Sequence, residues 1–330
     1  MGPHPAVAEV RRAVRENLQR LGDARVLVAC SGGADSLALA AAVAFEAPRA
    51  GVLAGLVTVD HGLQPGSAAQ ARRVAAIGAE LGLNPVEILP VVVGTAGGPE
   101  AAARTARYAA LDAVAAALDA RVLLGHTLDD QAETVLLGLG RGSGPRSIAG
   151  MRARQGRWIR PLLGVRRSTT AAACAALGLD PWTDPHNADP AYQRVRLRTE
   201  VLPLLEDVLH GGVAEALART AALLQDDLDA VDALAQGFEV HQRCPDPTIA
   251  GHMLDVGELG AQPRAIRTRS LRTWTRANGA APLSAGHTAA LDALITDWHG
   301  QGPVDLPGGV RVARASGKLV VSPRADCDQE

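Results

Sequence analysis

The sequence predicts an α/β protein in which a parallel sheet with helices on both faces is followed by a mainly helical domain. Two observations support this prediction. Apolar runs alternate with amphipathic stretches over the first 140 residues, and apolar residues at helical spacing dominate beyond residue 190. At 330 residues, the chain exceeds the usual size of one domain. We therefore expect a first domain at 1–200 and a second at 201–330.

The first domain alternates short apolar runs with alanine-rich amphipathic segments. The apolar runs predict strands at 26–30, 52–59, 86–92 and 121–125. The segments between them predict helices at 36–47, 67–82 and 100–119. Such alternation builds parallel sheets, in which ligands bind beyond the carboxyl ends of the strands. The residues that follow each strand are therefore the first candidates for a functional site.

The second domain is expected to be helical until close to its end. Leucine and valine recur at helical spacing from Val201 to Leu234, and Pro203 is expected to kink or restart the first helix. The Pro-Asp-Pro stretch at 245–247 indicates a linker. The segments 304–312 and 318–321 predict a small β-hairpin.

A glycine-containing loop joins the first predicted strand to the first predicted helix. It reads Ser31-Gly32-Gly33-Ala34-Asp35-Ser36. A strand that turns through glycines into a helix directs backbone N–H groups and the positive end of the helix dipole at one point, which favours phosphate. A Walker A loop is excluded because it needs a lysine here, and the chain's lone lysine is Lys318. The third glycine of a dinucleotide-binding loop is also missing.

The loop resembles the Ser-Gly-Gly-x-Asp-Ser loop of the ATP pyrophosphatases, which cleave ATP between its α and β phosphates while adenylating a substrate. Its two glycines would let the backbone close on pyrophosphate, and Ser31 and Ser36 would add hydroxyl donors. Asp35 would be an oxygen ligand for magnesium. An ordinary glycine-rich turn is the alternative explanation.

Polar residues also follow the second and fourth predicted strands. Asp60 and His61 come after the second strand, and Gly125 and His126 after the fourth. Because the carboxyl ends of parallel strands meet at one edge of the sheet, we expect these residues beside the glycine loop. His126 is either a catalytic residue or a hydrogen-bonded histidine at a strand end, and the sequence leaves both open.

Acidic residues open the helix that follows the fourth strand. Asp130 and Glu133 are three residues apart and share a helix face, from which both carboxylates could reach a nucleotide. Two clustered acids suit a magnesium ion or an ammonium group. Alternatively, Asp129 and Asp130 only cap the helix and complement its dipole.

These motifs, in this order, resemble the tRNA(Ile)-lysidine synthetase family, and the resemblance runs through about residue 200. It is carried by Ser31 to Ser36, Val59-Asp60-His61-Gly62-Leu63, 100–108, Gly125-His126, 129–134, Arg141-Gly142-Ser143-Gly144, Arg160-Pro161-Leu162-Leu163 and 182–189. One stretch departs from the family pattern. The family has Arg-Asn-x-Ile-Arg where residues 194–198 of this chain read Arg-Val-Arg-Leu-Arg.

The resemblance implies a PP-loop, or adenine nucleotide α-hydrolase-like, fold and a two-step reaction. ATP adenylates the carbonyl oxygen at carbon 2 of the wobble cytidine in tRNA(Ile) with a CAU anticodon. The ε-amine of free L-lysine then displaces AMP, and the resulting lysidine changes codon reading from AUG to AUA. Adenylation creates a good leaving group where the carbonyl oxygen was a poor one. The family also implies Mg²⁺ as cofactor and suggests a homodimer.

The resemblance assigns roles to individual residues of this chain. Residues expected to bind ATP are Ser31, Gly32, Gly33, Ala34, Asp35, Ser36, Asp60, His61, Gly125 and His126. The catalytic candidates are Asp35, Asp130, Glu133 and Arg107, of which Asp35 and Asp130 are also the candidate metal ligands. Residues expected to contact the tRNA are Arg104, Arg107, Arg141, Arg146, Arg160, Arg194 and Arg196.

Positive charge is locally concentrated, as an RNA substrate requires, although the formal net charge of the chain is −2. The segment 141–170 contains eight arginines and no acidic residue, and we expect it to form a loop-rich, RNA-binding segment at the edge of the sheet. A second arginine cluster, at 264–276, suits one side of a helix. For both, a solvated face or ion pairing within the chain is the alternative explanation.

Rival functions make different demands on the sequence. Enzymes that thiolate tRNA share the ATP loop but need clustered or reactive cysteines, whereas Cys30, Cys174, Cys244 and Cys327 lie far apart. An ammonia-dependent synthetase would not need the arginine-rich segment, and a non-enzymatic tRNA-binding module would not turn over nucleotide. We find no signal peptide and no apolar run of membrane-spanning length, so we expect a cytoplasmic protein without a membrane partner.

Overall fold

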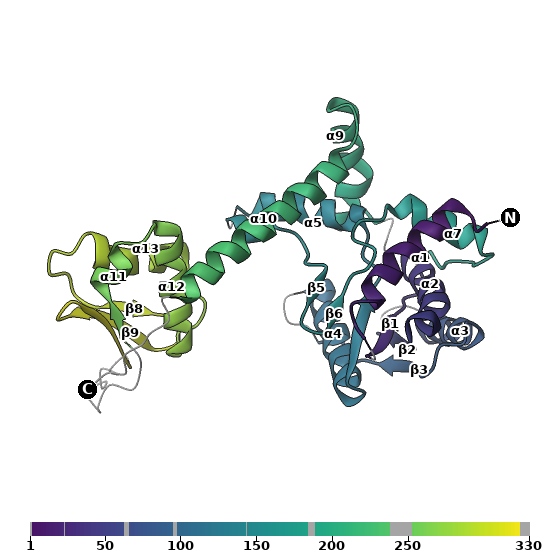
Figure 1. Cartoon of the computed structure of the whole chain (residues 1–330), viewed down its shortest axis with the longest axis horizontal. Coiled ribbons are helices and arrows are strands. Elements are labelled where there is room, and N and C mark those ends of the chain that lie inside the picture. The colour runs from purple at the N-terminus through teal and green to yellow at the C-terminus, as the bar shows by residue number, and fades with distance from the viewer. Residues whose placement is uncertain are drawn as a thin grey trace. The chain divides into compact units, whose positions relative to one another are not determined.

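The computed structural model describes residues 2–22, 24–62, 66–94, 98–142, 144–183, 189–237 and 253–323. The chain divides into two compact units, Met1–Gln225 and Asp226–Glu330, and the helix α10 (Val213–Gln236) spans the division (Figure 1). The linker predicted at 245–247 lies outside the described residues. No helix among the described residues is both long enough and apolar enough to cross a membrane.

The first unit is built on a six-stranded sheet with the strand order β3-β2-β1-β4-β6-β5. Its strands are β1 (Arg25–Ala29), β2 (Leu53–Asp60), β3 (Val86–Pro90), β4 (Ala120–Leu124), β5 (Arg154–Gln155) and β6 (Trp158–Ile159). All neighbouring pairs are parallel except β5 and β6. The four predicted strands are therefore confirmed. The direction of winding reverses between β1 and β4, which is where open α/β sheets bind ligands.

Helices cover both faces of this sheet, as predicted (Figure 1). They are α1 (Pro5–Leu18), α2 (Ala34–Ala50), α3 (Ser67–Glu80), α4 (Pro99–Ala117), α5 (Leu128–Arg141), α6 (Pro145–Ile148) and α7 (Arg167–Ala176). Successive side chains of β1 point to opposite faces. Val26 and Val28 pack in one core with α1, α2 and α7, whereas Leu27 packs in another with Leu111 and Ala115 of α4. Burial on both faces explains why this strand is a continuous apolar run.

The end of the first unit is a nearly continuous helical stretch. It consists of α8 (Gln193–Arg196), the π-helix η2 (Leu197–Val201) and α9 (Leu202–Val208). Pro203 lies in the first turn of α9, where the π-helix gives way to an α-helix and its missing N–H is tolerated. Leu202 of α9 and Ala214 of α10 pack against Leu128 and Ala132 of α5. This packing places the stretch beside the helix that carries the predicted acidic residues.

The second unit combines helices with an antiparallel sheet of order β7-β10-β9-β8. Its remaining elements are β7 (Leu254–Asp255), α11 (Val256–Gly260), α12 (Arg264–Ala277), α13 (Ala285–Thr296), β8 (Val304–Leu306), β9 (Val310–Ala315) and β10 (Lys318–Pro323). The predicted hairpin is present as β9 and β10, and β7 and β8 extend it on either side. Leu271, Leu291, Val312 and Leu319 are fully buried in the core between these helices and strands.

Candidate active site

The glycine loop between β1 and α2 adopts a conformation that requires glycine at only one of its two glycine positions. Gly32 has a φ of +88°, and a Cβ there would lie 2.4 Å from the side-chain nitrogen of Gln70 and 2.8 Å from Val74. Gly33 has a φ of −73° and is the N-cap of α2, which no side chain caps there. The first N–H groups of α2 are thus left available for an anion.

Ser36 holds the loop closed from the inside. Its buried hydroxyl donates to the carbonyl oxygen of Gly33 at 2.9 Å and accepts from the backbone N–H of Ser31 at 3.2 Å. The hydroxyl of Ser31 lies 3.3 Å from that of Ser36, and Ser31 is the exposed residue of the two. Ser36 therefore shapes the loop, whereas Ser31 is placed to meet a ligand.

Gly125 brings the end of β4 against the loop. A Cβ at this position would lie only 3.1–3.2 Å from backbone atoms of Asp35 and Ser36. For a Cβ to fit, these backbone atoms at the helix start would have to move by a few tenths of an ångström, so this close approach favours glycine. The structure thus brings Gly125 together with the glycine loop at the point where the order of strands reverses.

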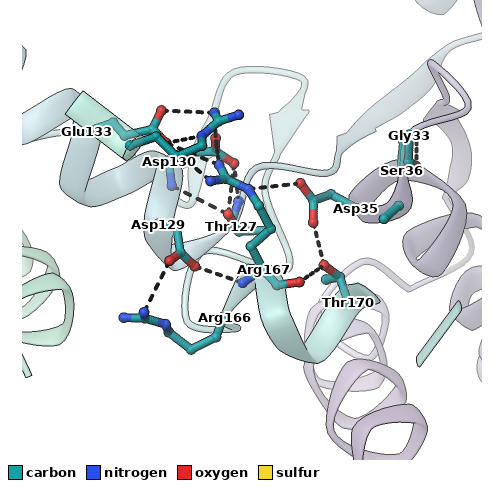
Figure 2. Close-up of polar contacts among 12 residues, drawn as sticks. Gly33, Asp35, Ser36, Thr127, Asp129, Asp130, Glu133, Arg166, Arg167 and Thr170 are labelled. Atoms are coloured by element: carbon teal, nitrogen blue, oxygen red, sulfur yellow. Dashed lines mark hydrogen bonds and ion pairs between the residues drawn. The ribbon is translucent and has the colours of Figure 1, made fainter. Parts of the chain in front are cut away.

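Asp35, in the first turn of α2, faces α7 (Figure 2). The hydroxyl of Thr170 donates to Oδ1 of Asp35, and Nε of Arg167 lies 3.6 Å from Oδ2. Burial raises the pKa of Asp35 above its usual range, and Asp130 acts in the same direction. Thr170 and Arg167 oppose the rise because both stabilise the carboxylate.

The acids at the start of α5 have divided roles. Thr127 is the N-cap, and Oδ2 of Asp130 accepts from the N–H of Thr127 at 2.8 Å, which completes a capping box. Oδ1 of Asp130 instead lies 2.6 Å from Nη2 of Arg167 (Figure 2). Asp129 accepts the backbone N–H of Arg167 at 2.7 Å, so it caps α7. Capping of their own helix therefore accounts for one oxygen of Asp130, whereas Asp129 bonds the start of α7 and pairs with Arg166 at 3.3 Å.

Glu133 is fully buried among arginines. Its carboxylate lies 2.9 Å from Nε of Arg198, 3.3 Å from Nη1 of Arg167 and 3.9 Å from Nη1 of Arg194. Arg194 and Arg198 are four residues apart and share one face of the α8–η2 stretch. We refer to Asp35, Asp130, Glu133, Arg167 and Arg198 as the carboxylate–arginine cluster.

Opposite forces set the charge of Asp130 within this cluster. Burial acts to raise its pKa, but Arg167 and the hydrogen bonds from Thr127 bring the pKa below its usual range. Asp130 is therefore ionised at neutral pH, whereas the pKa of Asp35 is shifted upward. Two neighbouring carboxylates with pKa values moved apart in this way are typical of a functional site.

His126 follows Gly125 and is neutral at pH 7. Burial lowers its pKa to about 4, and the nearby Arg160 and Arg104 act in the same direction while Asp130 opposes. The buried Nδ1 of His126 has no hydrogen-bond partner among the described residues. This nitrogen is thus available to a ligand bound beyond the end of β4.

Asp60 is the last residue of β2 and His61 follows it, at the same edge of the sheet. Asp60 accepts the N–H of Gly62 at 3.1 Å. A hydrogen bond from Ser67, and then this one, lower the pKa of Asp60. Asp60 therefore stabilises the turn between β2 and α3, and His61 beside it is partly buried.

The arginine-rich segment 141–170 folds around the short β5–β6 hairpin at the edge of the sheet, in keeping with the prediction of its place. Some of its arginines pair with acids from other segments. Arg157 lies 2.9 Å from Asp112, and Arg166 lies 3.1 Å from Glu215. The predicted RNA contacts Arg141 and Arg146 are exposed, whereas Arg160 is buried. The local excess of positive charge is thus partly neutralised within the chain.

The other predicted RNA contacts occupy different surroundings. Arg104 and Arg107 are exposed on α4 beside the ring of Tyr108. Arg196 points away from Glu133 and pairs with Glu200 at the surface, at 2.9 Å. Of the second arginine cluster, Arg267 pairs with Asp292 and Arg269 with Asp232, so ion pairing within the chain explains these two.

Three residues that complete the site were not predicted from the sequence. Arg167 and Thr170 come from α7, and Arg198 comes from the π-helix η2. The spacing of four between Arg194 and Arg198 was the one available signal that both face the same partner. Residues 184–188 of the predicted motif at 182–189 lie outside the described part of the chain.

The described residues do not form a metal site of three or more His, Cys, Asp or Glu side chains. Asp35 and Asp130 are the carboxylates closest to the loop that fit a magnesium ion by their chemistry. Magnesium commonly takes one or two protein carboxylates and completes its shell with phosphate oxygens and water. The donor set therefore fits magnesium that arrives with a nucleotide.

Comparison with known proteins gives matches along almost the whole chain. The pattern of a PP-loop domain matches residues 7–205, and that of a TilS substrate binding domain matches residues 254–320. The chain is 58% identical over 325 residues to a tRNA(Ile)-lysidine synthase from Thermobifida fusca, covering 97% of this chain and 99% of the relative. It is 50% identical over 333 residues to one from Mycobacterium tuberculosis, covering 99% of this chain and 97% of the relative.

A solved structure shows the same fold at low sequence identity. The U34-tRNA thiolase NcsA from Methanococcus maripaludis matches with a TM-score of 0.56 and 19% identity, covering 67% of this chain and 80% of that chain. At this identity the likeness concerns the fold alone.

Proposed function

The chain belongs to the tRNA(Ile)-lysidine synthase family, and on this basis we propose that it converts the wobble cytidine of CAU-anticodon tRNA(Ile) to lysidine. The protein is a ligase that joins L-lysine to carbon 2 of the base through an adenylated cytidine. ATP is cleaved to AMP and diphosphate, and codon reading changes from AUG to AUA. The observation that carries this assignment is a glycine loop with no side-chain cap beside buried carboxylates, in a chain of which 97% matches one of these ligases.

The glycine loop is the proposed binding site for the phosphates of ATP. The uncapped N–H groups of α2 and the exposed hydroxyl of Ser31 supply donors, and Ser36 keeps the loop in shape. Asp35 and Asp130 would hold Mg²⁺, which supplies positive charge opposite the phosphates. The unpaired Nδ1 of His126 supports a nucleotide contact at the end of β4.

Asp130 and Glu133 are the proposed recognition site for the lysine ammonium group. Both carboxylates already bind cationic groups, because Arg167 lies 2.6 Å from Asp130 and Arg198 lies 2.9 Å from Glu133. An incoming ammonium group would therefore bind beside these guanidinium groups or take the place of one of them. Either way, both carboxylates stay paired with a cation. A carboxylate that is ionised at neutral pH, as Asp130 is, suits the task of orienting the amine for attack on carbon 2.

Exposed arginines near the glycine loop and the carboxylate–arginine cluster are the proposed contacts to the RNA backbone. Arg104 and Arg107 lie on α4, Arg141 and Arg146 flank the end of α5, and Arg196 lies on α8. Contacts of this kind make binding weaken steeply as the salt concentration rises. The family also supports a role for the second unit in tRNA binding, and we place the reaction in the cytoplasm. A homodimer stays a prediction.

A tRNA-thiolating enzyme is the alternative with a related fold, and the described cysteines argue against it. Cys30 and Cys174 are both buried. Burial raises the pKa of both thiols, that of Cys174 to about 11. Neither thiol is therefore a good nucleophile at neutral pH.

Transfer of radiolabelled lysine to a tRNA(Ile) transcript with a CAU anticodon tests the proposed function. We expect incorporation that requires ATP, magnesium and Asp35, with little transfer to the methionine tRNA transcript that shares the anticodon. Asp180→Asn is the matched control, because Asp180 is an exposed aspartate of the same unit. Release of pyrophosphate without RNA, but with a small carboxylic acid, would instead indicate an ammonia-dependent synthetase.

A further inference from the structure

We propose that the cavity between α4 and the β5–β6 hairpin binds an unstacked nucleobase of the RNA, next to the reacting cytidine. The cavity has a volume of about 540 Å³ and is lined by Arg104, Tyr108, Gln155, Trp158 and Arg160, among others. A volume of this size falls within the range of sites that hold small ligands. This inference rests on the proposed function, because it names a second contact of the same substrate.

Two aromatic rings form one wall of the cavity. The rings of Tyr108 and Trp158 have centroids 4.9 Å apart and are inclined by 60°. Both side chains are only partly buried, so they pack on the sheet and still offer surface to the cavity. Aromatic side chains that are open to solvent on one side are the usual platforms for unstacked bases of single-stranded RNA.

Arginines surround this aromatic wall. The guanidinium group of Arg104 lies 4.9 Å from the centroid of the Tyr108 ring, and its Nη2 lies 3.4 Å from the phenolic oxygen. Arg160 is 7% exposed, and its Nε has no hydrogen-bond partner among the described residues. A buried guanidinium N–H without an acceptor is unfavourable, and it favours a ligand that brings acceptor atoms. A nucleotide brings both a ring to stack and oxygen atoms to bond.

The register of the sheet places one end of the cavity, at Arg160, at the edge of the sheet that holds the glycine loop. β6 runs parallel to β4, and Ile159 pairs with Leu123. Arg160 therefore leaves the sheet at the same edge as Gly125 and His126. The glycine loop and the carboxylate–arginine cluster contribute no residue to the cavity wall, so the cavity suits a neighbouring base better than the adenylated one.

A coupling measurement with altered RNA tests this inference. The protein is used whole, and its affinity is measured for full-length tRNA(Ile) transcripts that carry an abasic residue at the cytidine or at either flanking position. We expect Trp158→Ala to weaken binding of intact RNA about tenfold, as loss of one stacked base does. When the RNA lacks the flanking base that occupies the cavity, the same substitution should change the affinity for that RNA less than about twofold.

Other outcomes would overturn the inference. An equal loss for Trp158→Ala on every RNA means that no base stacks there, and coupling with the cytidine itself means that the cavity holds the reacting base. Trp298→Ala is the matched control, because Trp298 is a partly exposed tryptophan of the second unit and should show no coupling. Lysine transfer by the wild-type enzyme is measured on the same intact RNA. Failure of transfer contradicts the proposed function, whereas absent coupling with normal transfer contradicts only this inference.

A second variant keeps the test decisive if Trp158→Ala does not fold. Trp158 packs against a buried cluster, whereas Arg104 is exposed, so Arg104→Ala should fold normally. We expect Arg104→Ala to show coupling with the same flanking base, since its side chain lies against the Tyr108 ring. Uniform weakening across all RNAs would mean that Arg104 binds only phosphate, and the inference would fail.

Discussion

Arginine and aspartate meet in buried contacts in both units of this protein, but the two arrangements differ. In the second unit, Arg267 and Asp292 form a bidentate pair with contacts of 2.5 and 3.2 Å, and Nη1 of Arg267 bonds the carbonyl oxygen of Gln262 at 2.8 Å. In the first unit, Arg167 contacts Asp35, Asp130 and Glu133 at once. The first arrangement is a pair between two helices, α12 and α13. The second joins acids of α2 and α5 to an arginine of α7, next to the glycine loop.

The comparison shows that a buried ion pair alone does not indicate function. Arg267 and Asp292 are both 8% exposed and link helices α12 and α13, so their contact fixes the packing of that unit. The carboxylate–arginine cluster instead adjoins the glycine loop, and a quarter of the Asp35 side chain is exposed. Accessible charge next to a loop with free N–H groups is what distinguishes the candidate active site.

Asp35→Asn should give the largest effect and separates function from stability. Asparagine keeps the shape of the side chain but removes the charge that would hold magnesium. We expect lysine transfer to fall on the order of 10²–10³-fold, as when a group that stabilises developing charge is removed. Folding raises the pKa of Asp35, so ionised Asp35 destabilises the folded state at neutral pH, and the variant should be at least as stable.

Single-turnover lysine transfer and urea unfolding at pH 7 measure the two quantities for Asp35→Asn. A variant that retains transfer would remove Asp35 from the mechanism. A variant that loses stability and activity together would make Asp35 a structural residue like Asp292.

Asp292→Asn should give the opposite result. It leaves Arg267 buried without its anion, and we expect the second unit to lose about 3 kcal/mol of free energy of unfolding. Adenylation by folded protein should be unchanged, because the pair lies in the other unit from the glycine loop. Replacing both partners, with Arg267→Met and Asp292→Leu, should recover part of the stability. A loss of adenylation by the folded variant would contradict the structural role.

Arg167→Met should shift the pH dependence of the reaction. Arg167 is the main group that opposes the effect of burial on Asp130, so its loss raises the pKa of that carboxyl. In the wild type the pKa of Asp130 is low, so the stability from its ionised form is present above the usual aspartate pKa and is lost as the pH falls through the lowered value. In the variant the folded-state pKa lies closer to the unfolded value, so this contribution should be smaller and its loss should be complete at a higher pH.

The acid limb of the rate of lysine transfer should move upward by about one to two pH units in Arg167→Met, the usual effect of an adjacent guanidinium on a carboxyl pKa. Arg73→Met is the matched control, because Arg73 pairs with an exposed aspartate away from the cluster. An unchanged acid limb would show that Asp130 does not govern the rate.

Arg198→Ala and Arg196→Ala provide the finest comparison, since the two arginines lie half a turn apart. Arg198 bonds the fully buried Glu133, and its loss should lower the free energy of unfolding by about 1.5 kcal/mol. Arg196 pairs with the exposed Glu200, and its loss should leave stability unchanged within experimental error. Urea unfolding of both variants measures the difference. Equal losses would mean that Glu133 does not depend on Arg198.

Much of the first unit could be predicted because its local patterns are strong. The apolar runs of β1, β2 and β4 are buried on both faces, so their sequence shows little except strand. Gly32, Asp35 and Gly125 were found because loop residues after strands carry chemistry in such sheets. The second unit was less predictable, since β7 has only two residues and its pairing with β10 depends on distant sequence.

The sequence by itself determined the succession of the main strands and helices along the chain of the first unit, the glycine loop and the acidic start of α5. Periodicity and local chemistry specify these features. Only the tertiary structure decided which groups meet. Thr170 bonds Asp35 across 135 positions of the chain, and Arg198 reaches Glu133 across 65. The stacked wall of Tyr108 and Trp158 likewise joins α4 to β6. Contacts of this kind depend on how helices pack around a sheet, and no pattern of nearby residues contains that information.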